Sequence, residues 1–380
     1  MSTTVGIITY HAAYNFGSVL QAYATQKAYE QEEADAYIIN YRPKSQVSYY
    51  EPLYRTGYSA KTFVQDLMLA PVRKKRIIRA KRFEKFINEQ LQLTKRVDSN
   101  SELQKFSDSF DVFVSGSDQI LNIHSNEYQG EDRSAMKPYL LDFAHGRKVS
   151  YASSPANATD EELQYIANDL RSFKLLSARE QDAAQRLSRI VGIPVENVLD
   201  PTLLPSRDQW RKLAAEAADE QTLPDEYAVY YTLDGTKALF NRIGLLNRLS
   251  DSIGMPVIVI SPFAFFLSSK KIIDGRSAGP AEFIALLDRA SLVVTDSYHG
   301  TLFSMNLETP FLSISNGKGS STRKDQVLDR MHAKDSIVAN LQEAVERVET
   351  SGIPAVQHVD DYLIPARESS LEYIRRTLQA

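Results

Sequence analysis

The sequence has no cysteine, few histidines and no long apolar segment. Of its 380 residues none is Cys and only 6 are His. The lack of Cys excludes a disulfide framework, a thiol nucleophile and a Cys-ligated metal. No run approaches the roughly 18 apolar residues of a membrane span, and the N-terminal MSTTVGIITY has no basic segment before an apolar core. We therefore expect a cytoplasmic protein.

The charge is nearly balanced. The chain has 44 Lys and Arg against 48 Asp and Glu, a net charge of −4, and 43% of its residues are apolar. Such a composition supports large cores and excludes wholesale disorder and collagen-like repeats. It also argues against a dedicated nucleic-acid binder, while a local basic patch remains open.

Short runs of β-branched and aromatic residues alternate with longer segments of helical spacing. This alternation predicts two parallel-sheet α/β domains that face each other across a cleft. The expected strands are 5–10, 36–41, 111–115, 149–152 and 175–178 in the first series and 228–231, 256–260, 292–295 and 310–314 in the second.

The expected domain boundaries follow from the two series. We predict an N-terminal domain over 1–205, a C-terminal domain over 206–360 and a terminal helix over 361–380 that packs back on the N-terminal domain. Residues 200–205 and a helix over 210–218 form the expected crossing between the domains.

A basic, Tyr-rich helical insertion over about 44–105 interrupts the first series. It contains Tyr49, Tyr50, Tyr54 and Tyr58, followed by eight basic residues between Arg73 and Lys85. Apolar residues between the charges are typical of a helix with a solvated face. The alternative is a surface that contacts an anionic glycan, a membrane or an assembly partner.

Loops at the carboxyl ends of parallel strands are where α/β proteins bind ligands. The first such loop carries Asn15, Gly17 and Ser18, with Ser18 as the expected cap of a helix that begins near Val19. These residues bind a substrate or are simple turn and cap residues. The loop has no GxGxxG pattern, so a dinucleotide site is not indicated.

The second loop reads Ser115, Gly116, Ser117 and Asp118, directly after a predicted buried strand. Small hydroxyl residues and a carboxylate can bind sugar hydroxyls, although a capped turn has the same appearance. The third loop carries Arg179, whose guanidinium suits a carboxylate or phosphate. The alternative for Arg179 is an ion pair with Glu180 or with a neighbouring helix.

The fourth loop holds the strongest local signal. Asp296, Ser297, His299, Gly300 and Thr301 follow a predicted strand and precede an apolar helix expected over 302–307. A His in this position can act as an acid or base beside a helix N-terminus that attracts anions, or it is a structural residue. The remaining histidines show no metal-ligand spacing and HExxH is absent, so we expect no metal site.

Taken together, these motifs identify the chain as similar to the polysaccharide pyruvyl transferase family, over nearly its whole length. The resemblance rests on the order of seven segments: 6–10 with 15–23 at the start, then 110–119, 148–152, 177–180, 200–204, 279–283 and 295–301. It implies two Rossmann-like domains similar to B-type glycosyltransferases. It also implies that a pyruvyl group is transferred from phosphoenolpyruvate, as co-substrate, to two hydroxyls of a sugar. The sugar would belong to a surface or exported polysaccharide, and no cofactor is implied.

The resemblance also implies roles for individual residues. Family members with an assigned site hold phosphoenolpyruvate with an Arg-x-His motif and a second Arg. The His matches His299 and the second Arg matches Arg179, while Ser297 stands where the first Arg would be, so Arg323 or Lys324 would supply that charge. Donor binding then falls to Arg179, Arg323, Ser297, Gly300 and Thr301. We expect His299, Asp118 and Asp296 to be catalytic, and acceptor binding by Asn15, Gly17, Ser18, Ser115, Gly116 and Ser117.

Two other functions fit the same pattern. One is a glycosyltransferase with a nucleotide-sugar donor, because fold does not fix function. The other is a non-catalytic glycan-binding or assembly protein, with Arg73–Lys85 as its partner surface. The sequence does not identify the acceptor or show whether it is lipid-linked. It also leaves open whether the protein works at the inner face of the membrane.

Overall fold

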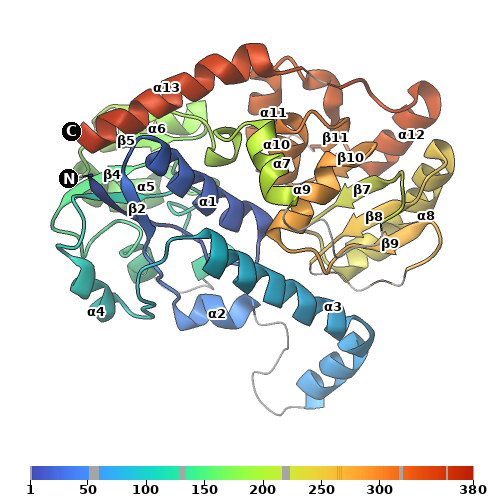
Figure 1. Ribbon diagram of the computed structural model, residues 1–380, viewed down its shortest axis with the longest axis horizontal. Coiled ribbons are helices and arrows are strands. Elements are labelled where there is room, and N and C mark those ends of the chain that lie inside the picture. The colour runs from blue at the N-terminus through green and yellow to red at the C-terminus, as the bar shows by residue number, and fades with distance from the viewer. Residues whose placement is uncertain are drawn as a thin grey trace. The chain divides into compact units, whose positions relative to one another are not determined.

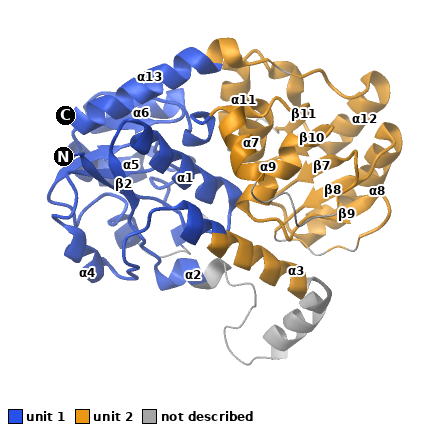
Figure 2. Ribbon diagram, viewed as in Figure 1, with its two compact units in different colours: residues 1–50, 86–205, 363–380 blue, residues 51–85, 206–362 orange. Residues whose placement is uncertain are grey.

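The computed structural model consists of parallel sheets covered by helices (Figure 1). It describes residues 2–50, 60–128, 133–215, 223–262, 264, 266, 268–315, 320–356 and 358–379. The chain divides into two compact units (Figure 2). Unit 1 comprises residues 1–50, 86–205 and 363–380, and unit 2 comprises residues 51–85 and 206–362.

Unit 1 is built on a four-stranded parallel sheet in the order β2-β1-β3-β4. A parallel bridge between Val149 and Leu175 links this sheet to the pair β5-β6. The strands are β1 (Thr4–Ile8), β2 (Asp35–Ile38), β3 (Val112–Ser115), β4 (Arg147–Ser150), β5 (Leu176–Ala178) and β6 (Val195–Asn197). The helices with most of their residues in this unit are α1 (Phe16–Gln31), α2 (Lys44–Tyr50), α4 (Asn100–Leu103), α5 (Asp160–Arg171), α6 (Gln181–Val191) and α13 (Asp360–Gln379).

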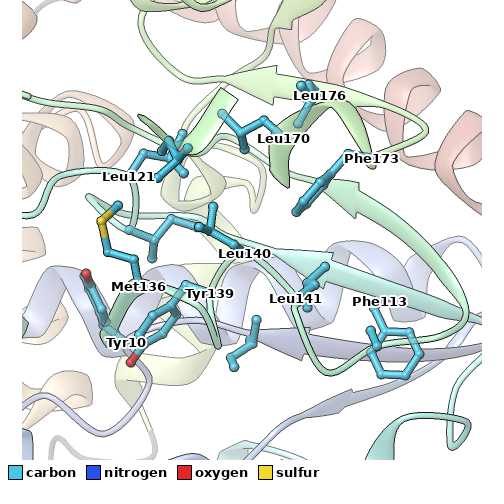
Figure 3. Close-up of a cluster of buried hydrophobic side chains, with 14 of the residues drawn as sticks. Tyr10, Phe113, Leu121, Met136, Tyr139, Leu140, Leu141, Leu170, Phe173 and Leu176 are labelled. Carbon is cyan, nitrogen blue, oxygen red and sulfur yellow. The ribbon is translucent and has the colours of Figure 1, made fainter. Parts of the chain in front are cut away.

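The core of unit 1 combines strand residues with the long segment between β3 and β4. Phe113 of β3 belongs to one cluster of buried side chains with Tyr139, Leu140 and Leu141 of that segment and Leu170 of α5 (Figure 3). Apolar residues at helical spacing put one face of α5 into this core, and its N-terminus is fixed by a capping box between Thr159 and Glu162.

Unit 2 contains a six-stranded parallel sheet in the order β12-β11-β10-β7-β8-β9. Its strands are β7 (Ala228–Tyr231), β8 (Val257–Ile260), β9 (Ile272–Asp274), β10 (Leu292–Thr295), β11 (Phe311–Ile314) and β12 (Ile337–Val338). Its helices are α7 (Arg207–Ala215), α8 (Thr236–Ile253), α9 (Pro280–Asp288), α10 (Tyr298–Asn306), α11 (Ser320–Arg330) and α12 (Leu341–Ser351). The long helix α3 (Ala60–Gln90) has most of its length in this unit.

Both faces of the unit 2 sheet are buried. Successive side chains of a strand point to opposite faces, so neighbouring residues enter different cores. Tyr230 of β7 packs in one core with Leu246 of α8 and Val345 of α12. Its neighbour Tyr231 faces the other way and contacts Phe283 of α9, with ring centroids 5.0 Å apart. Since all strands are parallel, the loops after them emerge at one edge of the sheet.

The strands expected from the sequence are confirmed, with ends that differ by at most three residues. The strands β6, β9 and β12 were not expected, because each has only two or three residues. The expected helix starts were wrong: α1 begins at Phe16 rather than near Val19, and α10 begins at Tyr298 rather than at Leu302. In both cases the cap lies earlier, at Asn15 and Ser297.

The basic, Tyr-rich segment is divided between the units. Residues 44–50 and 86–105 belong to unit 1, whereas 51–85 belong to unit 2. Tyr54 and Tyr58 lie outside the described residues, as do the side chains of Tyr49 and Tyr50. The basic residues lie on α3, some of them exposed and some half-buried or buried. In the part of the chain that the structure describes, no helix is long and apolar enough to cross a membrane.

Candidate active site

The residues singled out in the sequence fall into two groups, one in each unit. Both groups follow the carboxyl ends of parallel strands, as expected for α/β ligand sites. Unit 1 holds the acceptor-binding candidates, Asp118 and Arg179, and unit 2 holds the groups around His299.

The start of α1 places Ser18 in contact with Asp118, so two of the predicted site residues lie together. Asn15 is the N-cap, and its side chain accepts a hydrogen bond of 2.9 Å from the Gly17 N–H. Ser18, in the first turn, does not cap the helix. Its hydroxyl instead donates to Asp118 Oδ2 at 2.7 Å. Asn15 and Gly17 therefore shape the loop, while Ser18 orients a carboxylate.

The loop after β3 needs a glycine. Gly116 has φ of 120°, and a Cβ at this position would lie 2.3 Å from the carbonyl oxygen of Tyr151. The hydroxyl of Ser115 donates to the Tyr139 carbonyl, and that of Ser117 donates to the Ala152 carbonyl at 2.7 Å. Both hydroxyls are buried and bonded to backbone, so these serines hold the loop in place.

Arg179 lies among three carboxylates, which we call the carboxylate network: Asp118, Glu180 and Asp200. Its guanidinium donates to Asp200 Oδ2 at 2.9 Å and to Glu180 Oε1 at 3.1 Å, and it lies 3.7 Å from Asp118 Oδ1. The Arg179 side chain is only 1% exposed. One buried cation thus faces three carboxylates, so the ion pair with Glu180, considered from the sequence as the alternative for Arg179, is present.

Hydroxyl groups complete the carboxylate network. Ser154 donates to Glu180 at 2.8 Å, and Thr202 donates to Asp200 at 2.6 Å. Helix α13 supports the same region, because the Ser370 hydroxyl accepts from the Leu199 N–H at 3.0 Å. Buried charges persist only when they are paired and hydrogen-bonded in this way.

The unit 2 group begins with Asp296, at the end of β10. Its Oδ2 accepts from the Thr232 hydroxyl at 2.6 Å and lies 3.5 Å from the guanidinium of Arg242. Arg242 also donates to the Tyr230 hydroxyl at 2.6 Å and pairs with Asp234 at 2.7 Å. Burial raises the pKa of Asp296 above its ordinary value, a direction that favours a carboxyl able to hold a proton.

The first turn of α10 carries His299. Ser297 caps this turn by accepting from the Gly300 N–H at 3.3 Å, so that N–H is occupied. Gly300 must lack a side chain, since a Cβ would lie 2.6 Å from Thr295 Oγ1 and 2.7 Å from the Tyr231 ring. His299 is half-buried, and its ring lies edge-on against that of Tyr298 at 5.2 Å.

Thr301 is placed differently from the other members of this group. It is fully buried, donates to the Ser297 carbonyl at 3.0 Å and is bonded to the Ser313 hydroxyl at 2.9 Å. Thr301 therefore fixes α10 against β11, and its hydroxyl is used inside the protein.

Two cations lie beside this turn. Arg323 and Lys324 belong to the first turns of helix α11, not to a loop as expected. Lys324 Nζ donates to the carbonyls of Asp296 at 2.7 Å and Ile314 at 2.6 Å, and the Arg323 guanidinium lies 5.8 Å from the centre of the Tyr298 ring. Burial lowers the pKa of Lys324 to about 8. The edge of unit 2 therefore combines a His, a carboxyl and two cations.

Sequence reasoning missed several members of both groups. Thr232 and Asp234 directly follow a strand that was predicted, so their position was a usable signal. Arg242 lies in the second turn of α8, where a basic residue gives no sign of pointing at the sheet edge. Within the described residues, no group of three or more His, Asp or Glu side chains is placed to hold a metal ion.

Residues 15–318 match the sequence model of the polysaccharide pyruvyl transferases. The chain belongs to this family. A family member of this kind is a transferase, and a polysaccharide acceptor is implied by the family. No curated protein sequence matches the chain.

Solved structures of other proteins share the fold of this family member. The UDP-GlcNAc 2-epimerase of Methanocaldococcus jannaschii, in complex with UDP-GlcNAc and UDP, is 14% identical with a TM-score of 0.54, over 100% of this chain and 99% of that chain. The UDP-GlcNAc 2-epimerase of Neisseria meningitidis is 10% identical with a TM-score of 0.52, over 100% of both chains. The predicted fold class, α/β with two Rossmann-like domains, is confirmed.

Proposed function

We propose that this transferase moves the pyruvyl group of phosphoenolpyruvate onto two hydroxyls of a saccharide, forming a cyclic ketal and releasing phosphate. The acceptor belongs to a surface or exported polysaccharide, and the reaction takes place in the cytoplasm. One observation carries the proposal beyond the family: His299, Asp296, Arg323 and Lys324 gather around the N-terminus of α10, at the carboxyl edge of one parallel sheet.

The donor needs cations, because phosphoenolpyruvate carries a carboxylate and a phosphate. Ser297 stands where the family resemblance implies an Arg, and as a buried N-cap it provides no charge. Arg323 and Lys324 supply positive charge beside the same turn, and the N-terminal end of α10 adds its dipole. Arg179 has its guanidinium committed to the carboxylate network, so we place the donor anion with the unit 2 cations.

The reaction adds one proton to the donor and removes one proton from each of two sugar hydroxyls. A proton is added to the methylene carbon of phosphoenolpyruvate, and the resulting cationic centre is attacked by one sugar hydroxyl, which loses its proton to a base. The C–O bond to phosphate breaks, and the second hydroxyl attacks the same carbon and loses its proton. Of the two hydroxyl protons, one makes up for the proton added to the methylene carbon and the other leaves with the phosphate. We assign the protonation step to His299 or Asp296.

The acceptor hydroxyls need oriented oxygen acceptors. Asp118 is held by Ser18 and by its own backbone neighbour, since the Gln119 N–H donates to Asp118 Oδ1 at 2.8 Å. The loops that carry Ser18 and Asp118 also contain the other acceptor-binding candidates: Asn15, Gly17, Ser115, Gly116 and Ser117. We therefore propose Asp118 as the residue that orients or deprotonates the sugar.

The test combines ligand binding with turnover. Phosphoenolpyruvate should raise the melting temperature of the protein, whereas uridine and guanosine diphosphates should not. Incubation with phosphoenolpyruvate and candidate lipid-linked or nucleotide-linked saccharides should give equal amounts of released phosphate and of product with the mass of the ketal. Stabilisation by a nucleoside diphosphate alone would instead favour a nucleotide-sugar glycosyltransferase. Glycan binding without turnover would favour a non-catalytic protein.

The affinity for phosphoenolpyruvate should fall as the pH rises through about 8. Burial lowers the pKa of Lys324 to about 8, so its charged form is present below this pH and is lost above it. Binding an anion favours the charged form, and the dissociation constant should rise by up to about tenfold per pH unit above this value. Titration calorimetry over a pH series measures this dissociation constant. The phosphate of the ligand titrates near pH 6, so its own protonation does not cause a change above pH 8.

A matched variant isolates Lys324 from other titrating groups. Lys324→Arg keeps its charge throughout this range and should remove the loss of affinity above pH 8. An unchanged alkaline fall in Lys324→Arg would assign the effect to a different group.

A further inference from the structure

The basic residues of α3 form two stripes on the same helix. Lys75, Arg79 and Arg82 recur at i, i+4 and i+7, and we call them the inner stripe. Lys74, Lys81 and Lys85 recur at i, i+7 and i+11, and we call them the outer stripe. At about 100° per residue the centres of the two stripes lie roughly 100° apart around the helix, so the stripes occupy different faces.

The inner stripe is used to attach α3 to the rest of unit 2. Lys75 pairs with Asp274 at 3.2 Å, and Arg82 pairs with Glu282 at 2.9 Å and donates to the Ser277 carbonyl at 3.0 Å. Arg79 is buried, with its guanidinium 4.5 Å from the centre of the Phe83 ring. These contacts fix which side of α3 faces outward.

The outer stripe is exposed and its charges are not neutralised within the described part of the chain. Lys74, Lys81 and Lys85 are all exposed, and none forms an ion pair with a residue that the structure describes. Some other exposed lysines are paired, such as Lys105 with Glu102 and Lys334 with Asp329. The outer stripe instead presents three exposed positive charges on one face of a single helix.

We infer that the outer stripe docks unit 2 onto an anionic membrane surface. From Lys74 to Lys85 the helix rises about 16 Å, so the three ammonium groups form a straight row. A row of positive charge on one rigid helix is complementary to a flat layer of anionic headgroups, to which each lysine contributes favourably. Arg73, next to Lys74 and also exposed, adds a further positive charge about 100° around the helix from the row. The association is peripheral and electrostatic.

Co-sedimentation with lipid vesicles tests the inference, using the full chain. The protein should bind vesicles with about one third phosphatidylglycerol at low salt, should be released by salt, and should not bind vesicles of phosphatidylcholine alone. The variant Lys74→Gln/Lys81→Gln/Lys85→Gln should bind at least about tenfold more weakly, while its melting temperature stays within a few degrees of the parent, because these side chains are exposed.

Two control variants make the result specific. Lys105→Gln/Lys137→Gln/Lys334→Gln removes the same charge from paired surface lysines and should bind vesicles as the parent does. Lys75→Gln/Arg82→Gln should lower the melting temperature but keep vesicle binding. Equal weakening of vesicle binding by both triple variants would overturn the inference. It would also be overturned if the folded parent did not bind anionic vesicles, and an acidic protein would then be the partner to test. Neither depends on the enzymatic proposal, which is measured by phosphate release.

Discussion

His299→Asn should lower the rate of phosphate release from phosphoenolpyruvate in the presence of acceptor by about 10²–10⁴-fold. His299 is the imidazole in the first turn of α10, with Asp296 and Lys324 at the same sheet edge. Asn keeps a polar side chain of similar length but cannot transfer the proton. The steady-state rate at saturating donor and acceptor measures the effect, and the binding of phosphoenolpyruvate should change far less than the rate.

His332→Asn provides the matched control. His332 is exposed in the same unit and has φ of 54°, a conformation that Asn tolerates well. This variant should retain the parental rate and stability. If His299→Asn released phosphate as fast as His332→Asn, with a ketal product of the expected mass, His299 would be a structural residue and the protonation step would pass to Asp296.

Arg179→Met should destabilise the protein by about 3–5 kcal/mol, because it leaves three buried carboxylates without their cation. The Arg179 side chain is 1% exposed, and Glu180 and Asp200 are 4% and 1% exposed. Such a loss is a large share of the stability of a typical protein, so the variant could fail to fold. Equilibrium denaturation by urea measures the change, and Arg179→Lys, which keeps the charge without the fork, should lose less.

Arg376→Met is the control for the loss of an arginine. Arg376 makes a two-pronged ion pair with Glu196, but the side chains are 42% and 41% exposed, so its loss should cost below about 1 kcal/mol. Arg179→Lys also separates two roles. If it binds phosphoenolpyruvate within a few-fold of the parent, Arg179 positions the carboxylate network; a loss above about tenfold would return Arg179 to the donor site.

The strands and the loops that follow them could be predicted from the sequence, because runs such as 228–231 and 292–295 are apolar on both faces of a parallel sheet. The position of Asp296 and His299 at a sheet edge followed directly. Partners within each site could not be predicted, since Arg242 reaches Asp296 from a helix that starts after a different strand.

The basic segment shows the same limit. Its eight positive charges within 13 residues look uniform in the sequence. Helical geometry predicts that they lie on more than one side, but only the acids at Asp274 and Glu282 decide which side is attached. These acids are about 200 residues away along the chain, so their pairing depends on the tertiary fold.

Unit 1 is built from three separate segments of the chain, and this arrangement affects the order of folding during synthesis. Its third segment, residues 363–380, contains most of α13. In this segment the Tyr373 hydroxyl donates to the Ser150 carbonyl, and Thr377 is bonded to Tyr29. These pairs span 223 and 348 residues. Every residue of unit 2 therefore leaves the ribosome before residues 363–380 do. The N-terminal unit, although translated first, is the last that can complete its native contacts, and until then the face of α1 that receives α13 is exposed to chaperones.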